Sequence, residues 1–107
     1  MTTKMFPKTK PIRIPALRKL AKGQECTLHI VGVCNHNPET TVFCHLNESF
    51  AGKGMGYKAD DIGVFACSEC HRAYDEGLVT REMYYYLLRG VVKTLRIAIE
   101  AGVITLG

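Results

Sequence analysis

Two pairs of cysteines constrain this 107-residue chain more than any other feature. Cys67 and Cys70 have the C-x-x-C spacing that lets two thiolates bind one ion from a turn that leads into a helix. Cys26 and Cys34 stand at the two ends of a segment with turn character, which brings their thiolates to one point. Four thiolates around a tetrahedral Zn²⁺, with Zn–S distances of about 2.3 Å, form a closed structural site. The spacing therefore predicts a structural zinc ion bound by these four cysteines.

Zinc at this site would decide whether the chain folds. Binding of the ion stabilises small zinc domains by on the order of 10–16 kcal/mol. A single domain of this size has a free energy of unfolding of only ~5–15 kcal/mol. We therefore expect the protein to unfold when zinc is removed.

The C-x-x-C-H run at residues 67–71 also matches a haem attachment site and a redox dithiol. Covalent haem attachment takes place outside the cytoplasm, whereas the N-terminus has no apolar run typical of an export signal. Both alternatives also leave Cys26 and Cys34 without a role. The odd number of cysteines, five, argues against a disulfide framework.

The fifth cysteine, Cys44, allows two interpretations. It could replace one of the zinc ligands, or it could be a small buried apolar residue. Alternation along the strand expected at 40–46 puts Cys44 on the same face as Val42 and Leu46. We favour burial for this reason.

The composition is that of a soluble, folded, single domain, with 47% hydrophobic and 22% charged residues. No stretch is long and apolar enough to span a membrane, so we expect a cytoplasmic protein without a membrane partner. Half of the 14 basic residues precede the first acid, Glu25, and this basic N-terminal arm, residues 1–22, suits a polyanion such as DNA. A solvated tail is the alternative. The basic residues of the arm are Lys4, Lys8, Lys10, Arg13, Arg18, Lys19 and Lys22.

Short apolar segments alternate with turn residues, which indicates an α+β fold. We expect helices at 16–22, at 68–75 before Gly77, and from Thr80 to about 101 before Gly102. Strands are expected at 40–46 and 61–67, and two short β segments at 26–35 that reverse near Gly32.

In the long C-terminal helix, one apolar stripe is expected to be core and an opposite stripe to be solvated. Gly90 is expected to permit a close packing contact, because glycine in mid-helix costs about 1 kcal/mol relative to alanine. The predicted core stripe is Tyr84, Leu87, Leu88, Val91, Leu95 and Ala98, and the predicted solvated stripe is Tyr85, Arg89, Lys93, Arg96 and Glu100.

His71 directly follows the second ligand of the C-x-x-C, so a helix rotates it by about 100° away from the zinc. Asp75 lies four residues later on the same face, where it and His71 could hold one divalent cation. With His45 on a neighbouring strand and Asp60 and Asp61 before the next one, such a site suits phosphodiester hydrolysis. Residues that could meet phosphate are Lys53, Lys58 and Arg72.

The runs CTLHIVGVCNHNPETTVFCHL, GKGMGYK and ACSECH resemble the YbcO-like family of small phage and prophage proteins, regarded as nucleases of the HNH or ββα-metal type. The resemblance extends from about Gly23 to the C-terminal helix. It implies a treble-clef-like zinc module in residues 23–107, action on DNA, and phage recombination proteins as partners.

The same resemblance implies catalytic roles. His45 would be the general base, and His71 would bind a catalytic Mg²⁺ or Mn²⁺ together with Asp61 or Asp75. Two departures stand out, because HNH enzymes have Asp or His where this chain has Cys44, and the middle Asn is absent, with Asp61 nearest to its place. A non-enzymatic zinc module that binds nucleic acid or protein is therefore the alternative.

Overall fold

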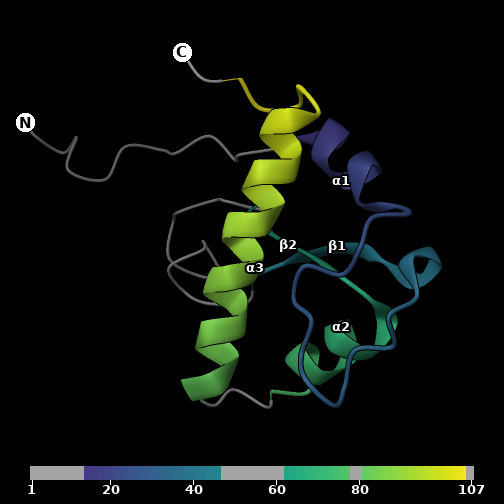
Figure 1. Ribbon diagram of the computed structural model, residues 1–107, viewed down its shortest axis with the longest axis vertical. Coiled ribbons are helices and arrows are strands. Elements are labelled where there is room, and N and C mark those ends of the chain that lie inside the picture. Colours follow the sequence, from purple (N-terminus) through teal and green to yellow (C-terminus); the bar gives the residue numbers. More distant parts are fainter. Residues whose placement is uncertain (1–13, 47–61, 78–80, 106–107) are drawn as a thin grey trace, which may run out of the picture.

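The computed structural model describes residues 14–46, 62–77 and 81–105. Figure 1 shows α3 running the length of the molecule, with α1 beside its C-terminal half and α2 beside its N-terminal half. The elements are α1 (Pro15–Ala21), the 3-10 turn η2 (Pro38–Thr40), β1 (Val42–His45), β2 (Gly63–Ala66), α2 (Ser68–Asp75) and α3 (Arg81–Glu100).

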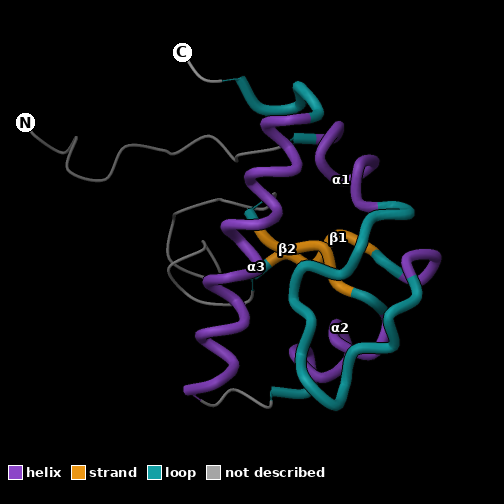
Figure 2. The backbone as a smooth tube through the Cα atoms, in the orientation of Figure 1, coloured by secondary structure: helices purple, strands orange, loops and turns teal. Residues whose placement is uncertain are grey.

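The two strands form an antiparallel hairpin that lies behind α3 in Figure 2, between α1 and α2. Cys44 pairs with Val64 and Phe43 with Phe65, so each pair occupies one face of the hairpin. The face with Cys44 and Val64 packs in the larger core with the cysteine loops and α2. The Phe65 face belongs to a smaller core with α1 and the end of α3, against which Phe43 packs.

The predicted helices are confirmed. Gly77 follows α2 with φ of 79°, and Gly102 follows α3 with φ of 76°, the left-handed conformation in which glycine ends helices. The close packing contact expected at Gly90 is also present. A Cβ at this position would lie 2.9 Å from Val64 Cγ1 and 3.3 Å from the Thr27 carbonyl oxygen. Only glycine therefore lets α3 lie this close to the hairpin.

The predicted core stripe of α3 is wrong, because the helix turns a different face toward the core. Leu87 and Ala98 are buried as expected, but Leu88 is 68% exposed and Tyr84 50%. Apolar residues cover most of the helix circumference, so periodicity alone left more than one possible inner face. The residues that face the core are Met83, Leu87, Gly90, Thr94 and Ala98.

The two short β segments predicted at 26–35 are wrong as well. His29 and Gly32 adopt positive φ, 49° and 79°, which interrupts extended backbone. Only Thr27 pairs with the hairpin, by donating its N–H to the Phe65 carbonyl over 2.7 Å. The N–H groups of His29 and Ile30 are bonded instead to cysteine sulfur, and those of Val33 and Cys34 to the Ile30 carbonyl.

Helix α1 packs on β1, and its Leu17 and Ala21 are buried beside Phe65 and Ala98. Residues 15–21 of the predicted basic arm are therefore part of the packed domain. Residues 1–13 lie outside the described part of the chain, as do Thr80 and the segment with Lys53, Lys58, Asp60 and Asp61. In the described part, no helix combines the length and the apolar character required to cross a membrane.

Candidate metal centre and nuclease site

The four cysteines predicted to bind zinc come together. The sulfur atoms of Cys26, Cys34, Cys67 and Cys70 all lie within 4.8 Å of one another. The first two come from the loop before β1, and the last two from the first turn of α2, where Cys67 is the N-cap. Three of the four side chains are buried, and Cys34 is half-buried. Four thiolate donors at one point suit a tetrahedral ion with soft ligands.

Backbone N–H groups point at each of the four sulfur atoms. His29 donates to Cys26 Sγ over 3.2 Å, and Ile30 to Cys70 Sγ over 3.4 Å. His36 donates to Cys34 Sγ and Cys70 to Cys67 Sγ, each over 3.4 Å. An N–H group that donates to sulfur stabilises the thiolate relative to the thiol. It also fixes the direction in which the sulfur atom points, as hydrogen bonds to metal ligands generally do. The loop conformation thus prepares the sulfur atoms to bind a cation.

Without a metal, the sulfur atoms must share protons. The hydrogen bond from the Cys70 thiol lowers the pKa of Cys26 to about 4, and the same bond raises the pKa of Cys70. Burial raises the pKa of Cys34 to about 11. Cys26 is therefore the thiol that loses its proton most readily, and a divalent cation would displace the protons held by Cys34 and Cys70.

Cys44 is not part of this group. It is 1% exposed and packs in the larger core. Burial, with a smaller contribution from the Asp75 carboxylate, raises its pKa to about 12, so it is a neutral thiol. The prediction of a buried apolar residue is confirmed.

Helix α3 anchors the first cysteine loop, which the sequence did not indicate. Arg89 Nη2 donates to the carbonyl oxygens of Leu28 and His29 over 3.3 and 3.2 Å, and Tyr86 Oη accepts the N–H of Val31 over 3.3 Å. The Arg89 guanidinium also lies 5.2 Å from the centre of the Tyr86 ring. The solvated position predicted for Arg89 is therefore wrong.

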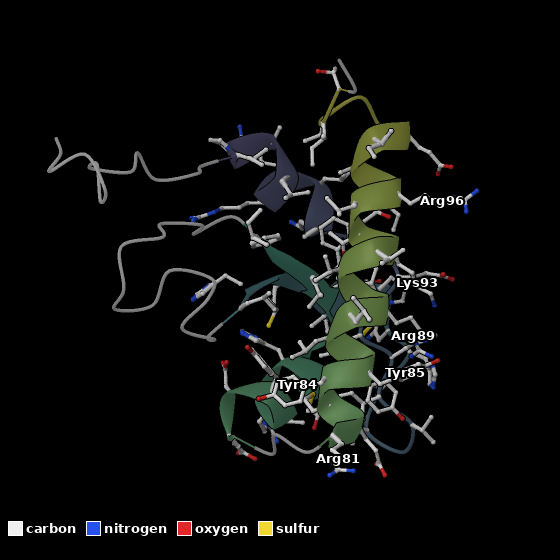
Figure 3. The ribbon with its side chains drawn as sticks, turned by 90° about the vertical axis from the view of Figure 1, so that its left-hand side faces the viewer. Arg81, Tyr84, Tyr85, Arg89, Lys93 and Arg96 are labelled. Atoms are coloured by element: carbon white, nitrogen blue, oxygen red, sulfur yellow. The ribbon has the colours of Figure 1, made fainter. Side chains whose placement is uncertain are left out.

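Figure 3 shows the labelled side chains along this helix, with Tyr85, Arg89, Lys93 and Arg96 on one side and Tyr84 on the other. Tyr85, Lys93 and Arg96 are exposed, as predicted. Arg89 differs from them because the loop carbonyls lie within reach of its guanidinium.

The predicted pair of His71 and Asp75 is present on α2. The Nε2 atom of His71 lies 3.1 Å from Asp75 Oδ2, and the two side chains are 36% and 49% exposed. Cys70 points into the sulfur group, whereas His71 belongs to none of the ligand groups formed by described residues. The helix therefore separates the structural ligand from the histidine that follows it.

His45 lies on the other face of the hairpin. It is the last residue of β1, and alternation puts it on the face of Phe43, opposite that of Cys44. It lines an open pocket of about 440 Å³ between α1 and β1. Two cationic side chains, Arg18 and Lys22, line the same pocket. The lining of this pocket also includes Glu39, but neither His71 nor Asp75.

Of the remaining predicted site residues, the structure describes only Arg72. Arg72 is exposed and lies 3.5 Å from Glu69 on the same helix. Asp61, Lys53 and Lys58 lie outside the described residues.

Comparison with known proteins identifies the relatives of this fold. A family model described as "Putative nuclease YbcO" matches residues 15–103. The chain belongs to the YbcO family. It is 40% identical over 92 residues to "Putative nuclease YbcO" of Escherichia coli K12, covering 82% of this chain and 95% of the relative. A protein of the same name from Enterobacteria phage 82 matches equally well.

A solved structure of an Escherichia coli K-12 protein, described as a "putative bacteriophage protein", is also similar. Its TM-score is 0.60 at 37% identity, over 81% of this chain and 100% of the other. The YbcO match begins at the first residue of α1 and includes every described helix and strand. The names of the YbcO relatives support a nuclease function in general terms and an association with phage.

Proposed function

We propose that this protein is a metal-dependent endonuclease of the HNH type that hydrolyses phosphodiester bonds of DNA in phage recombination or DNA processing. The observation that carries the proposal is the order β1, β2, α2, with His45 at the end of the first strand and His71 on the helix. The sulfur group holds the start of that helix. Membership of a family named for nuclease activity agrees with this arrangement.

In this proposal His71 and Asp75 hold a catalytic Mg²⁺ or Mn²⁺, with Asp61 as a further ligand. The 3.1 Å contact between imidazole and carboxylate brings two ligand atoms together on a half-exposed helix face. A carboxylate-rich site of this kind suits hard divalent ions. The ion would polarise the phosphate and stabilise the leaving oxygen.

His45 acts as the general base. Its pocket also contains Arg18 and Lys22, whose charges would attract a phosphate group toward the imidazole. A neutral imidazole within hydrogen-bond reach of water can take its proton as the water attacks phosphorus.

A second candidate function has an observation of its own. His45 lines a pocket that includes neither His71 nor Asp75, which does not favour a single shared site. A zinc-stabilised module that binds nucleic acid or protein without cleaving it needs no such site. Under this alternative, Arg18 and Lys22 contribute to binding alone.

The test is cleavage of supercoiled plasmid DNA by the full chain in a series of Mg²⁺ and Mn²⁺ concentrations. His45→Ala and His71→Ala are each expected to lower the rate by about 10²–10⁴-fold, the usual contribution of a general base or comparable group. Arg96→Ala serves as control, because the Arg96 side chain is 80% exposed and away from both sites.

Zinc content is measured for every variant, so that loss of fold is not taken for loss of chemistry. If the wild type cuts no faster than His45→Ala with any ion, the nuclease proposal fails. Retained DNA binding in that case would support the binding module.

A further inference from the structure

A second group of metal-ligand atoms adjoins the four-cysteine group and shares one residue with it. Ligand atoms of His29, Cys34 and His36 all lie within 4.8 Å of one another. The two imidazole rings are 5.2 Å apart between centroids, at an interplanar angle of 75°. Neither histidine was singled out from the sequence, since they are seven positions apart on either side of a turn.

The backbone holds both histidines in place without a second ion. His29 and His36 adopt φ of 49° and 56°, a left-handed conformation that is uncommon for residues other than glycine. The carbonyl of His29 accepts from Arg89 over 3.2 Å, and its N–H is bonded to Cys26 Sγ. The N–H of His36 is bonded to Cys34 Sγ over 3.4 Å. The strained conformation of each residue is thus fixed by the cysteine loop itself.

Cys34 is suited to bind two ions at once. It is the only one of the four sulfur ligands that is not buried, so one side of it is open toward the histidines. A thiolate sulfur keeps lone pairs after it binds one cation and can bridge to a second. Two imidazole nitrogens and one thiolate form a borderline donor set that selects Zn²⁺ or Co²⁺ over Mg²⁺.

We propose that His29, His36 and Cys34 bind a second divalent ion of the zinc class, with Cys34 as a bridge to the ion of the four-cysteine site. Three protein ligands leave one tetrahedral position to solvent, as in zinc sites with an exchangeable ligand. His36 is exposed and His29 and Cys34 are half-buried, so the ion exchanges more readily than the structural one. The site is independent of the proposed nuclease centre, which lies on α2 and β1.

The test counts zinc ions in the full chain by equilibrium dialysis against buffered free Zn²⁺, followed by elemental analysis. Excess Mg²⁺ is present to keep Zn²⁺ off the His71–Asp75 site of the proposed nuclease centre. Wild type is expected to bind two zinc ions per chain, and the double variant His29→Asn, His36→Asn one. Asparagine is chosen because it has no imidazole and is one of the few residues with a side chain that adopt left-handed φ. His45→Asn is the matched control and should still bind two ions.

The absorption spectrum of bound Co²⁺ gives a second readout, because it reports the ligands of each ion directly and does not depend on the ion count alone. The first equivalent should produce the intense sulfur-to-cobalt absorption of a four-thiolate site, and the second should add a weaker ligand-field band. The double variant should keep the first signal and lose the second. If the double variant does not fold, His36→Asn alone, at an exposed position, should weaken the second equivalent by about 100-fold or more, since each ligand carries a large share of zinc affinity.

Wild type that saturates at one ion, or a double variant that still binds two, would overturn the proposal. One ion with a cobalt spectrum that changes in the double variant would also overturn it, because the histidines would then be ligands of the first ion and not of a second.

Discussion

The side-chain oxygens of Thr27 and Thr94 lie 2.8 Å apart in the interior, although 67 residues separate them in the chain. Thr27 Oγ1 also accepts the N–H of Phe65 over 3.0 Å and lies 3.0 Å from its carbonyl oxygen. One threonine therefore joins the cysteine loop, the hairpin and α3 at a single point. Buried polar groups bonded in this way contribute to stability and fix the relative position of the elements.

We expect Thr94→Val to lower the free energy of unfolding by about 1 kcal/mol, because Thr27 keeps its bonds to Phe65. Thr27→Val should cost more, about 2 kcal/mol, since it removes the shorter bond of the Phe65 N–H and the bonds of Thr27 Oγ1 to the Phe65 carbonyl and to Thr94. The Phe65 N–H then keeps only its 3.3 Å bond to Thr94 Oγ1. Both are measured by urea unfolding at saturating zinc. Thr105→Val, at an exposed position, is the control, and an equal effect of Thr94→Val and Thr105→Val would contradict the argument.

Gly90→Ala should destabilise the protein by about 1 kcal/mol. The added methyl group would meet Val64 and the Thr27 carbonyl, and overpacking of about 1–3 kcal/mol exceeds the gain of about 1 kcal/mol in helix propensity. In a Val64→Ala background the collision is relieved, so the same substitution should become neutral or stabilising. The measurement is thermal unfolding of the wild type, Gly90→Ala, Val64→Ala and the double variant. If the two substitutions change the stability additively, a direct collision between residues 90 and 64 is excluded.

Cys67→Ser should abolish stoichiometric zinc binding and, with it, most of the folded structure. The serine hydroxyl is a poor replacement for a thiolate ligand, and zinc binding is worth more than the expected stability of the chain. Circular dichroism and zinc content are the measurements. A strong chelator should unfold the wild type in the same way, and zinc should restore the fold.

Cys44→Ala is the matched control for that experiment. It removes a thiol of similar burial that lies outside the sulfur group, so it should retain one structural zinc per chain. Equal zinc loss in the two variants would refute the assignment of the ligands.

Arg89→Met should destabilise the protein by about 1.5–3 kcal/mol, because it removes a charged donor from two loop carbonyls but keeps the apolar stem. The first cysteine loop is then held less firmly, so affinity for the structural ion should fall as well. Arg96→Met removes a guanidinium that is bonded only to the exposed Glu100 among the contacts of the described residues. Its cost should stay below about 0.5 kcal/mol.

Removal of residues 1–13 should weaken DNA binding and flatten its salt dependence without unfolding the domain. The deletion takes away Lys4, Lys8, Lys10 and Arg13 but leaves α1, whose Leu17 and Ala21 are buried. Loss of four phosphate contacts would reduce the slope of log K against log salt by up to about 3.6. Replacement of the same four bases by glutamine in the full chain separates charge from length. An unchanged slope in both variants would show that the arm does not meet DNA.

Local patterns in the sequence were sufficient for the helices, the hairpin strands and the four-cysteine group. The glycines at 77 and 102 end helices because only a residue without Cβ takes positive φ at little cost, and this holds whatever surrounds it. The sulfur group could be predicted because the C-x-x-C spacing of Cys67 and Cys70 lets both thiolates bind one ion, and Cys26 and Cys34 supply the other two ligands. These features depend on neighbours within a few residues.

Tertiary structure decided the features that depend on which surfaces meet. Apolar residues cover more than half of the circumference of α3, so only contact with the hairpin shows that Leu87 faces inward and Leu88 outward. Arg89 belongs to an outer stripe by periodicity, yet the loop carbonyls within its reach make it an anchor. His29 and His36 meet because two left-handed residues turn the cysteine loop back on itself, and no local pattern encodes that approach. The face of His45 was decided in the same way, by the packing of α1 on one side of the hairpin and α2 on the other.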